Sequence, residues 1–100
     1  MATTEEYKNY ISEQLKSVGD ITFKKMMGEY LLYYKGVLLG GIYDDRLLVK
    51  IVEENKKYDM DKALPYENGK EMYFVSDVDD QSALADVIKD TYKGLTNNKR

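Results

Sequence analysis

The sequence contains no cysteine and no histidine, and these two absences restrict the chemistry open to the protein. Without cysteine there is no disulfide framework, no thiolate nucleophile and no zinc site of the cysteine type. Without histidine, the commonest general base and the commonest metal ligand are missing. We therefore predict no catalytic residue, no metal site and no cofactor, and we expect the protein to work in a reducing cytoplasm.

Long hydrophobic runs and a strong basic charge are also missing. No apolar run approaches the roughly 20 residues of a membrane helix, and the N-terminal residues lack both the positive charge and the apolar core of a leader. The net charge of −3 arises from interleaved acids and bases, so no overall basic field attracts a phosphate backbone. We therefore expect no membrane partner and no direct binding to duplex DNA.

What is present is the composition of a small globular domain. The chain has 100 residues, of which 43% are hydrophobic, and a single proline. This length supports one core but not separate catalytic and regulatory units. We assign residues 1–95 to a single domain and residues 96–100 to a polar C-terminal tail, which has no apolar side chain to bury.

Two segments have hydrophobic residues at helical spacing. The first predicts a helix over residues 4–17, with Thr3 and Glu6 spaced as in a capping box and Gly19 ending it. The second follows the acidic residues 77–80, which we interpret as a helix cap and not a calcium loop, and is predicted to end near Gly94.

Three apolar, tyrosine-rich runs between these helices predict an antiparallel meander. Lys35-Gly36 and Asp44-Asp45 each fit a two-residue hairpin turn, and Asn68-Gly69 predicts another hairpin, returning over residues 71–76. Residues 53–61 predict a short middle helix. The order favours a two-layer α+β domain: an antiparallel sheet of four to six strands with flanking N- and C-terminal helices.

The two tight turns between residues 30 and 51 also predict which side chains share a face. With a regular register, the core face consists of Leu31, Tyr33, Leu38, Gly40, Ile42, Leu47, Val49 and Ile51. The opposite face mixes apolar, aromatic and basic residues, which suits a partly covered or interacting surface. We predict that this interaction surface consists of Tyr30, Leu32, Tyr34, Leu39, Tyr43, Arg46, Leu48 and Lys50.

Three further features have both a functional and a structural interpretation. Lys24, Lys25, Arg46 and Lys50 form a candidate basic patch for a phosphate or an acidic partner, but lysines also protect a solvated strand edge from pairing. The ten tyrosines suit base stacking, but core or interface packing is favoured. Gly40-Gly41 within a strand predicts a bulge or a close backbone approach.

Residues 21–52 resemble the N-terminal domain of the TfoX/Sxy competence-regulator family. The resemblance rests on Lys-Lys-Met-Met-Gly-Glu-Tyr at 24–30, Leu-Tyr-Tyr-Lys-Gly at 32–36 and Asp-Arg-Leu-Leu-Val-Lys at 45–50. The chain departs from the family pattern at Met27, where an aromatic residue is usual, and at Glu29 and Leu31, where glycines are usual. A feature that needs close backbone approach there is therefore not transferred.

The resemblance implies a fold like that of secretion chaperones, many of which dimerise. Full-length members carry a second domain similar to helix-hairpin-helix DNA-binding modules, which the 100 residues do not include, so a transcriptional role is not transferred. Our leading hypothesis is a cytoplasmic prokaryotic protein that acts without catalysis, as a regulatory or protein-interaction module that self-associates. The alternatives are a nucleic-acid-associated regulator that uses the basic patch, and a small-ligand-binding protein.

Overall fold

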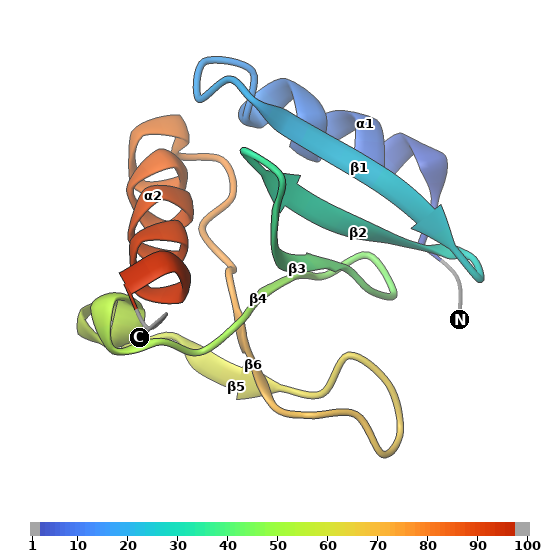
Figure 1. Cartoon of the computed structure of the whole chain (residues 1–100). Coiled ribbons are helices and arrows are strands. Elements are labelled where there is room, and N and C mark those ends of the chain that lie inside the picture. The colour runs from blue at the N-terminus through green and yellow to red at the C-terminus, as the bar shows by residue number, and fades with distance from the viewer. Residues whose placement is uncertain (1–2, 98–100) are drawn as a thin grey trace.

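The computed structural model describes residues 3–97 and has the predicted α+β architecture, with two helices packed on an antiparallel sheet (Figure 1). The sheet has six strands in the order β1-β2-β3-β4-β6-β5. The strands are β1 (Ile21–Met26), β2 (Glu29–Tyr34), β3 (Val37–Ile42), β4 (Leu47–Val49), β5 (Asp61–Ala63) and β6 (Met72–Phe74). The helices are α1 (Glu5–Gln14), the short 3-10 helix η1 (Glu53–Tyr58) and α2 (Gln81–Asn97).

Both predicted two-residue turns are present. Tyr34 pairs directly with Val37 across Lys35-Gly36. Tyr43 and Arg46 exchange both backbone hydrogen bonds across Asp44-Asp45. The Asn68-Gly69 pair does not make a hairpin turn of this kind. It lies within a longer connection, residues 64–71, between β5 and β6, where the Gly69 N–H donates to the Tyr66 carbonyl.

The two long helices cover one face of the sheet. The main core joins residues of α1 and α2 to the inner side chains of β2, β3, β4 and β6. The α1 region contributes Ile11 and Leu15 to this core, and α2 contributes Leu84, Val87 and Ile88. None of the helices within residues 3–97 is long and apolar enough to cross a membrane.

The N-terminal end of α1 differs from the predicted capping box. Thr4, and not Thr3, is the N-cap, and its hydroxyl accepts from the Tyr7 N–H at 3.1 Å. Thr3 instead donates through its N–H and its hydroxyl to the Glu29 carboxylate, at 3.1 and 2.6 Å. The same Glu29 oxygen accepts from the Asp44 N–H at 3.1 Å. Glu29, which stands where the family usually has glycine, therefore ties the start of α1 to the β3–β4 turn.

The ends of the two long helices also differ from the predictions. The α1 helix ends at Gln14, earlier than the predicted residue 17, and the chain turns before reaching the left-handed Gly19. The predicted acidic cap of α2 is Asp80, whose carboxylate accepts from the Ala83 N–H at 3.1 Å. The α2 helix continues past Gly94 to Asn97, so part of the predicted tail is helical, and residues 98–100 lie outside the described residues.

A β-bulge at Leu39 interrupts the register between β2 and β3. Leu32 pairs with Gly40, but the next residue, Tyr33, pairs with Leu38. Leu39 therefore has no partner in β2, which is the signature of one extra residue in one strand. Because successive strand residues point to opposite faces, one extra residue exchanges the faces of everything paired beyond it.

The predicted faces of β2 are consequently the wrong way round. Tyr30, Leu32 and Tyr34 lie in the main core, whereas Leu31 and Tyr33 lie on the other face and stay half-exposed. Leu38 also leaves the predicted core face, as the strand partner of Tyr33. The assignment of Ile42, Leu47 and Val49 to the core is confirmed, since these positions lie beyond the bulge near the β3–β4 turn.

The prediction of a bulge or a close approach at Gly40-Gly41 is confirmed. A Cβ atom on Gly40 would lie 2.1 Å from the Leu48 carbonyl oxygen, and one on Gly41 would lie 2.4 Å from the Tyr30 carbonyl oxygen. Both oxygens are backbone atoms, so neither can move aside as the end of a flexible side chain could. The contact between β2, β3 and β4 therefore requires glycine at both positions.

Replacing Gly40 tests this close approach. We expect Gly40→Ala to lower the free energy of unfolding by about 3 kcal/mol or more, because β3 and β4 must separate to admit the methyl group. The control is Gly36→Asn in the β2–β3 turn, where φ is +80° and nothing lies within 4 Å of the added Cβ. Asparagine tolerates that backbone, so its cost should stay near 1 kcal/mol or less. Urea unfolding measures both, and equal losses would contradict the close approach.

Candidate binding site

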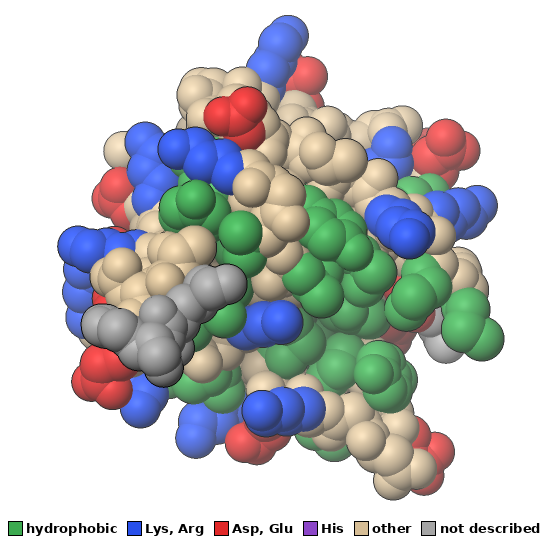
Figure 2. All heavy atoms as spheres, in the orientation of Figure 1, with side chains coloured by type: hydrophobic (Ala, Val, Ile, Leu, Met, Phe, Trp, Pro, Cys, Tyr) green, Lys and Arg blue, Asp and Glu red, His purple; other side chains and the backbone are tan. Residues whose placement is uncertain are grey.

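The face of the sheet opposite the helices is only partly covered. Tyr33 and Leu38 lie side by side on it as direct strand partners, and both are half-exposed. Neither belongs to a hydrophobic core cluster among residues 3–97. Figure 2 shows hydrophobic side chains gathered into one area over β2 and β3, with basic side chains around it. We call this side of the sheet the open face.

A small second core lies on the same face, toward β6. Leu48 is fully buried there, and Tyr43 and Met72 are nearly so. The Tyr43 ring meets the ring of Tyr66 edge to face, with centroids 6.1 Å apart. Burial, followed by the neighbouring Tyr66 and then Glu29, raises the pKa of Tyr43 above its usual value. This cluster closes one end of the open face and leaves the Tyr33–Leu38 end open.

A hollow of about 910 Å³ lies between the open face and the 64–71 connection. The sheet side of its lining includes Leu38, Tyr43, Lys50 and Met72, and Leu95 of α2 also contributes. The other wall is the connection itself, with Leu64, Pro65, Tyr66, Gly69, Lys70 and Glu71. In this wall Leu64 and Tyr66 keep 46% and 61% of their surface exposed, so the connection presents two large apolar side chains.

Arg46 holds the loop wall in place. Its Nη2 donates to the Leu64 carbonyl at 2.9 Å, and its Nε donates to the Tyr43 carbonyl at 3.2 Å. A guanidinium group suits this role because its donors lie in a fixed plane. The side chain therefore links the β3–β4 turn to the start of the 64–71 connection.

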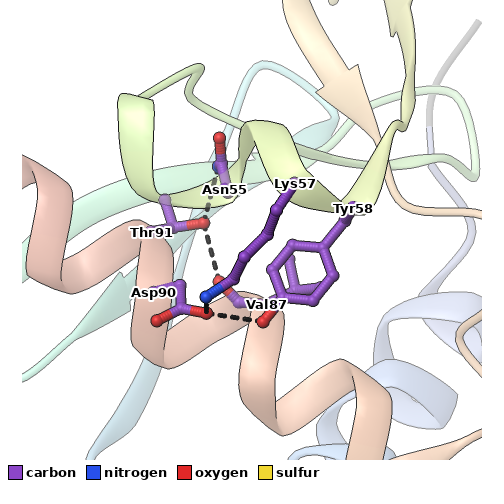
Figure 3. A network of polar contacts seen from close by, with 6 residues as sticks. All are labelled: Asn55, Lys57, Tyr58, Val87, Asp90 and Thr91. Carbon is purple, nitrogen blue, oxygen red and sulfur yellow. Dashed lines mark hydrogen bonds and ion pairs between the residues drawn. The ribbon is translucent and has the colours of Figure 1, made fainter.

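Asn55 fixes the chain at Lys50, in the sheet wall. The Asn55 side chain is fully buried, and its Nδ2 donates to the Lys50 carbonyl and to the Thr91 hydroxyl, both at 2.9 Å. Its Oδ1 accepts from the Val52 N–H at 3.1 Å. The Thr91 hydroxyl in turn donates to the Val87 carbonyl at 2.7 Å (Figure 3). The side-chain groups of Asn55 and Thr91 are paired throughout this network, which makes it a rigid joint between η1 and α2.

A second contact between η1 and α2 is charged. The Tyr58 hydroxyl donates to the Asp90 carboxylate at 2.5 Å, and Lys57 lies 3.1 Å from the same carboxylate (Figure 3). Burial and the hydrogen bond to Asp90 raise the pKa of Tyr58 to about 12. The hydrogen bond from Tyr58 and the charge of Lys57 lower the pKa of Asp90 below its usual value.

The structure separates the residues of the predicted interaction surface into three groups. Tyr30, Leu32, Tyr34 and Leu39 lie in the main core beneath the helices. Tyr43 and Leu48 lie on the open face but are buried in the second core. Arg46 and Lys50 are half-buried beside the hollow, where Arg46 holds the loop and Lys50 lines the wall. The first group is thus a correction, caused by the bulge at Leu39.

The four residues of the predicted basic patch do not share one face. Lys24 pairs with Leu31 of the open face, whereas Lys25 pairs with Tyr30 of the core face. The two lysines therefore point to opposite sides of edge strand β1. Arg46 is already committed to two carbonyl groups. A joint phosphate site of all four residues is not formed.

Sequence reasoning missed the loop side of the hollow. The residues concerned are Leu64, Tyr66 and Lys70, and the segment was read only as a hairpin turn around Asn68-Gly69. One signal was available, because apolar Leu64, Pro65 and Tyr66 stand together in a stretch with no strand or helix periodicity. An apolar group in a loop marks a segment that packs on something else.

A protein-family model matches the greater part of the chain. The model of the TfoX N-terminal domain matches residues 13–94, which include every strand of the sheet, η1 and most of α2. No curated protein matches the sequence.

Replacing Arg46 tests its hold on the loop wall. We expect Arg46→Met to raise the rate of chymotrypsin cleavage after Tyr66 about five- to tenfold, because losing hydrogen bonds worth ~1 kcal/mol frees the connection. Lys62→Met removes the same charge from an exposed position on β5 and should leave the rate unchanged. An unchanged rate in Arg46→Met would show that the guanidinium does not hold the loop.

The Tyr58–Asp90 contact predicts a pH dependence of stability. The native pKa of Tyr58 is about 12 against an ordinary 10.0, so its contribution is complete below pH 10 and is lost as the pH rises toward 12. The native pKa of Asp90 is lowered from 3.8, so its contribution is complete above that pH and is lost as the pH falls below it.

We expect Tyr58→Phe to lower the free energy of unfolding at neutral pH by about 1 kcal/mol. We also expect the difference between the two proteins to shrink at both pH extremes. Urea unfolding over a series of pH values measures this difference. Tyr33→Phe is the matched control, since no hydrogen bond of the Tyr33 hydroxyl is present within residues 3–97. A difference that does not vary with pH would contradict the assignment.

Proposed function

Because the chain belongs to the TfoX N-terminal domain family, we propose that it is a non-enzymatic regulatory module of the cytoplasm that acts by binding a protein surface, first of all a second copy of itself. The observation that carries this proposal is the half-exposed Tyr33–Leu38 pair on the open face. An antiparallel sheet with one face against water normally carries polar side chains there. Two adjacent large apolar residues outside both cores favour a partner instead.

The charges along the open face favour a second copy as that partner. Register pairs place Lys24, Leu31, Gly41, Leu48, Phe74 and Asp61 in one row across the sheet. The row is apolar in its middle, begins with an exposed lysine and ends with an exposed aspartate. Neither charge has an ion-pair partner among the described residues.

A face-to-face dimer pairs the exposed ends of this row twice, while Gly41 and Leu48 in its middle stay buried within each copy. A twofold axis that runs along the strands reverses the row in the second copy, so that Lys24 of each copy lies opposite Asp61 of the other. Such an interface is isologous, with the same patch on both subunits. Opposite charges at the two ends also exclude the arrangement in which the rows run in the same direction, since like charges would then meet.

The absence of histidine and cysteine agrees with a role without catalysis.

The oligomeric state tests this proposal. We expect sedimentation equilibrium to give a dimer, and Tyr33→Glu to weaken it at least tenfold by placing a charge at the centre of the patch. Met27→Glu makes the same kind of change at a turn residue that is 94% exposed and belongs neither to the Tyr33–Leu38 pair nor to the row, and it should dimerise normally. A wild-type protein that stays monomeric at millimolar concentration would overturn the self-association.

Exchanging the charges of Lys24 and Asp61 distinguishes the proposed head-to-tail pairing from nonspecific hydrophobic association. Lys24→Asp and Asp61→Lys should each weaken the dimer, and the double variant should restore it, because only the double variant again presents one charge of each sign. If the double variant is as weak as the single ones, the row is not paired head to tail.

A further inference from the structure

We propose that the hollow between the open face and the 64–71 connection is a binding site for a small organic anion with an apolar body, the class of medium-chain carboxylates and aryl sulfonates. This site goes beyond the self-association described above, because of the exposed Tyr33–Leu38 pair only Leu38 contributes to its lining, and much of the lining belongs to the connection.

Size and lining define the apolar part of the ligand. The hollow of about 910 Å³ is at the upper end of the range of small-molecule sites, roughly 300 to 1,000 Å³. Leu38 and Met72 form part of its sheet wall, and Leu64 and Tyr66 face them from the loop wall. Aliphatic and aromatic surfaces on both sides suit a chain or a ring system that is inserted between them.

Two lysines define the charge of the ligand. Lys50 contributes to the sheet wall and Lys70 to the loop wall, so a cation lies on each side. No ion pair of either ammonium group is present within residues 3–97. The lining contains one acid, Glu71, which is exposed to solvent. The balance is therefore positive, and an anionic head group would accept charge-assisted hydrogen bonds from the two ammonium groups.

Both walls are held in position before a ligand arrives. The Lys50 carbonyl is fixed by the buried Asn55, and the loop wall is attached through Arg46 at the Leu64 carbonyl. A site whose walls are already ordered loses less entropy on binding than a site that must form. Two lysines on an apolar hollow match one anionic group, whereas a nucleic acid backbone requires a longer row of cations.

Fluorescence titration with 8-anilinonaphthalene-1-sulfonate tests the site, because this aryl sulfonate has the proposed chemistry. We expect saturable binding that decanoate displaces. Decyltrimethylammonium has the same chain length and the opposite charge, and should not displace the probe at tenfold higher concentration. Equal displacement by both compounds would overturn the assignment of an anion site.

Two double variants separate the site from general electrostatic attraction. Lys50→Gln with Lys70→Gln should weaken binding of the probe about tenfold, since both anchoring charges are lost. Lys16→Gln with Lys25→Gln changes the net charge equally, at exposed residues that do not line the hollow, and should leave the affinity within a factor of two. Equal affinities in the two double variants would also overturn the proposal.

Two further measurements keep this test independent of folding and of dimerisation. Amide chemical shifts of residues 64–71 should move when the probe is added to the wild-type protein, and shifts confined to other segments would contradict the site. Tyr33→Glu should still bind the probe saturably, because Tyr33 does not line the hollow, although its strand partner Leu38 does. A failure of self-association thus leaves this test intact.

Discussion

The close approach of β2, β3 and β4 at the Gly40-Gly41 pair is the constraint on which the rest of the structure depends. Backbone oxygens of Leu48 and Tyr30 occupy the space that side chains would need, so no other residue fits without moving a strand. Leu39, the extra residue of the bulge, directly precedes Gly40 in the sequence. Together they set which side of β2 meets the helices, and hence which apolar residues remain outside the core.

Three polar side chains, here called anchors, fix segments that are distant in the sequence against one another. Glu29 attaches the start of α1 to the β3–β4 turn, Asn55 joins η1 to α2, and Arg46 attaches the 64–71 connection to the sheet. Each anchor is a polar side chain hydrogen-bonded to a segment distant in the sequence, through backbone groups for Arg46, a hydroxyl for Asn55 and both for Glu29, and each contact is short-range and directional. Hydrophobic packing brings the elements together, and these contacts determine where the loop wall stands relative to the sheet.

The sequence alone was sufficient for the fold class and the two tight turns, because these follow from local periodicity and turn chemistry. The family came from the resemblance of residues 21–52 to a known pattern. The sequence was also sufficient to mark Gly40-Gly41 as special. It was not sufficient for the faces of β2, since an extra residue at Leu39 leaves the alternating pattern of each strand intact and changes only their mutual register. A pattern of period two cannot reveal a bulge when both faces are apolar.

The candidate site was predicted least well, for a related reason. Arg46 and Lys50 were predicted as members of the interaction surface and of the basic patch. The hollow also needs Leu64, Tyr66 and Lys70, which are brought to it by a long-range contact. Residues 64–71 have no periodicity of their own, so nothing local indicates what they pack against. Loops obtain their conformation from such distant contacts, and single-sequence reasoning does not see them.

The attachment of α1 through Thr3 and Thr4 has a consequence for the order of events during synthesis. Thr4 binds Asp45, whose carboxylate lies 41 positions later in the chain. At roughly 5–20 residues per second, a ribosome adds that stretch in about 2–8 seconds. The residues of α1 are therefore synthesised seconds before Asp45, and the helix has no docking surface until the meander on which it packs has been made.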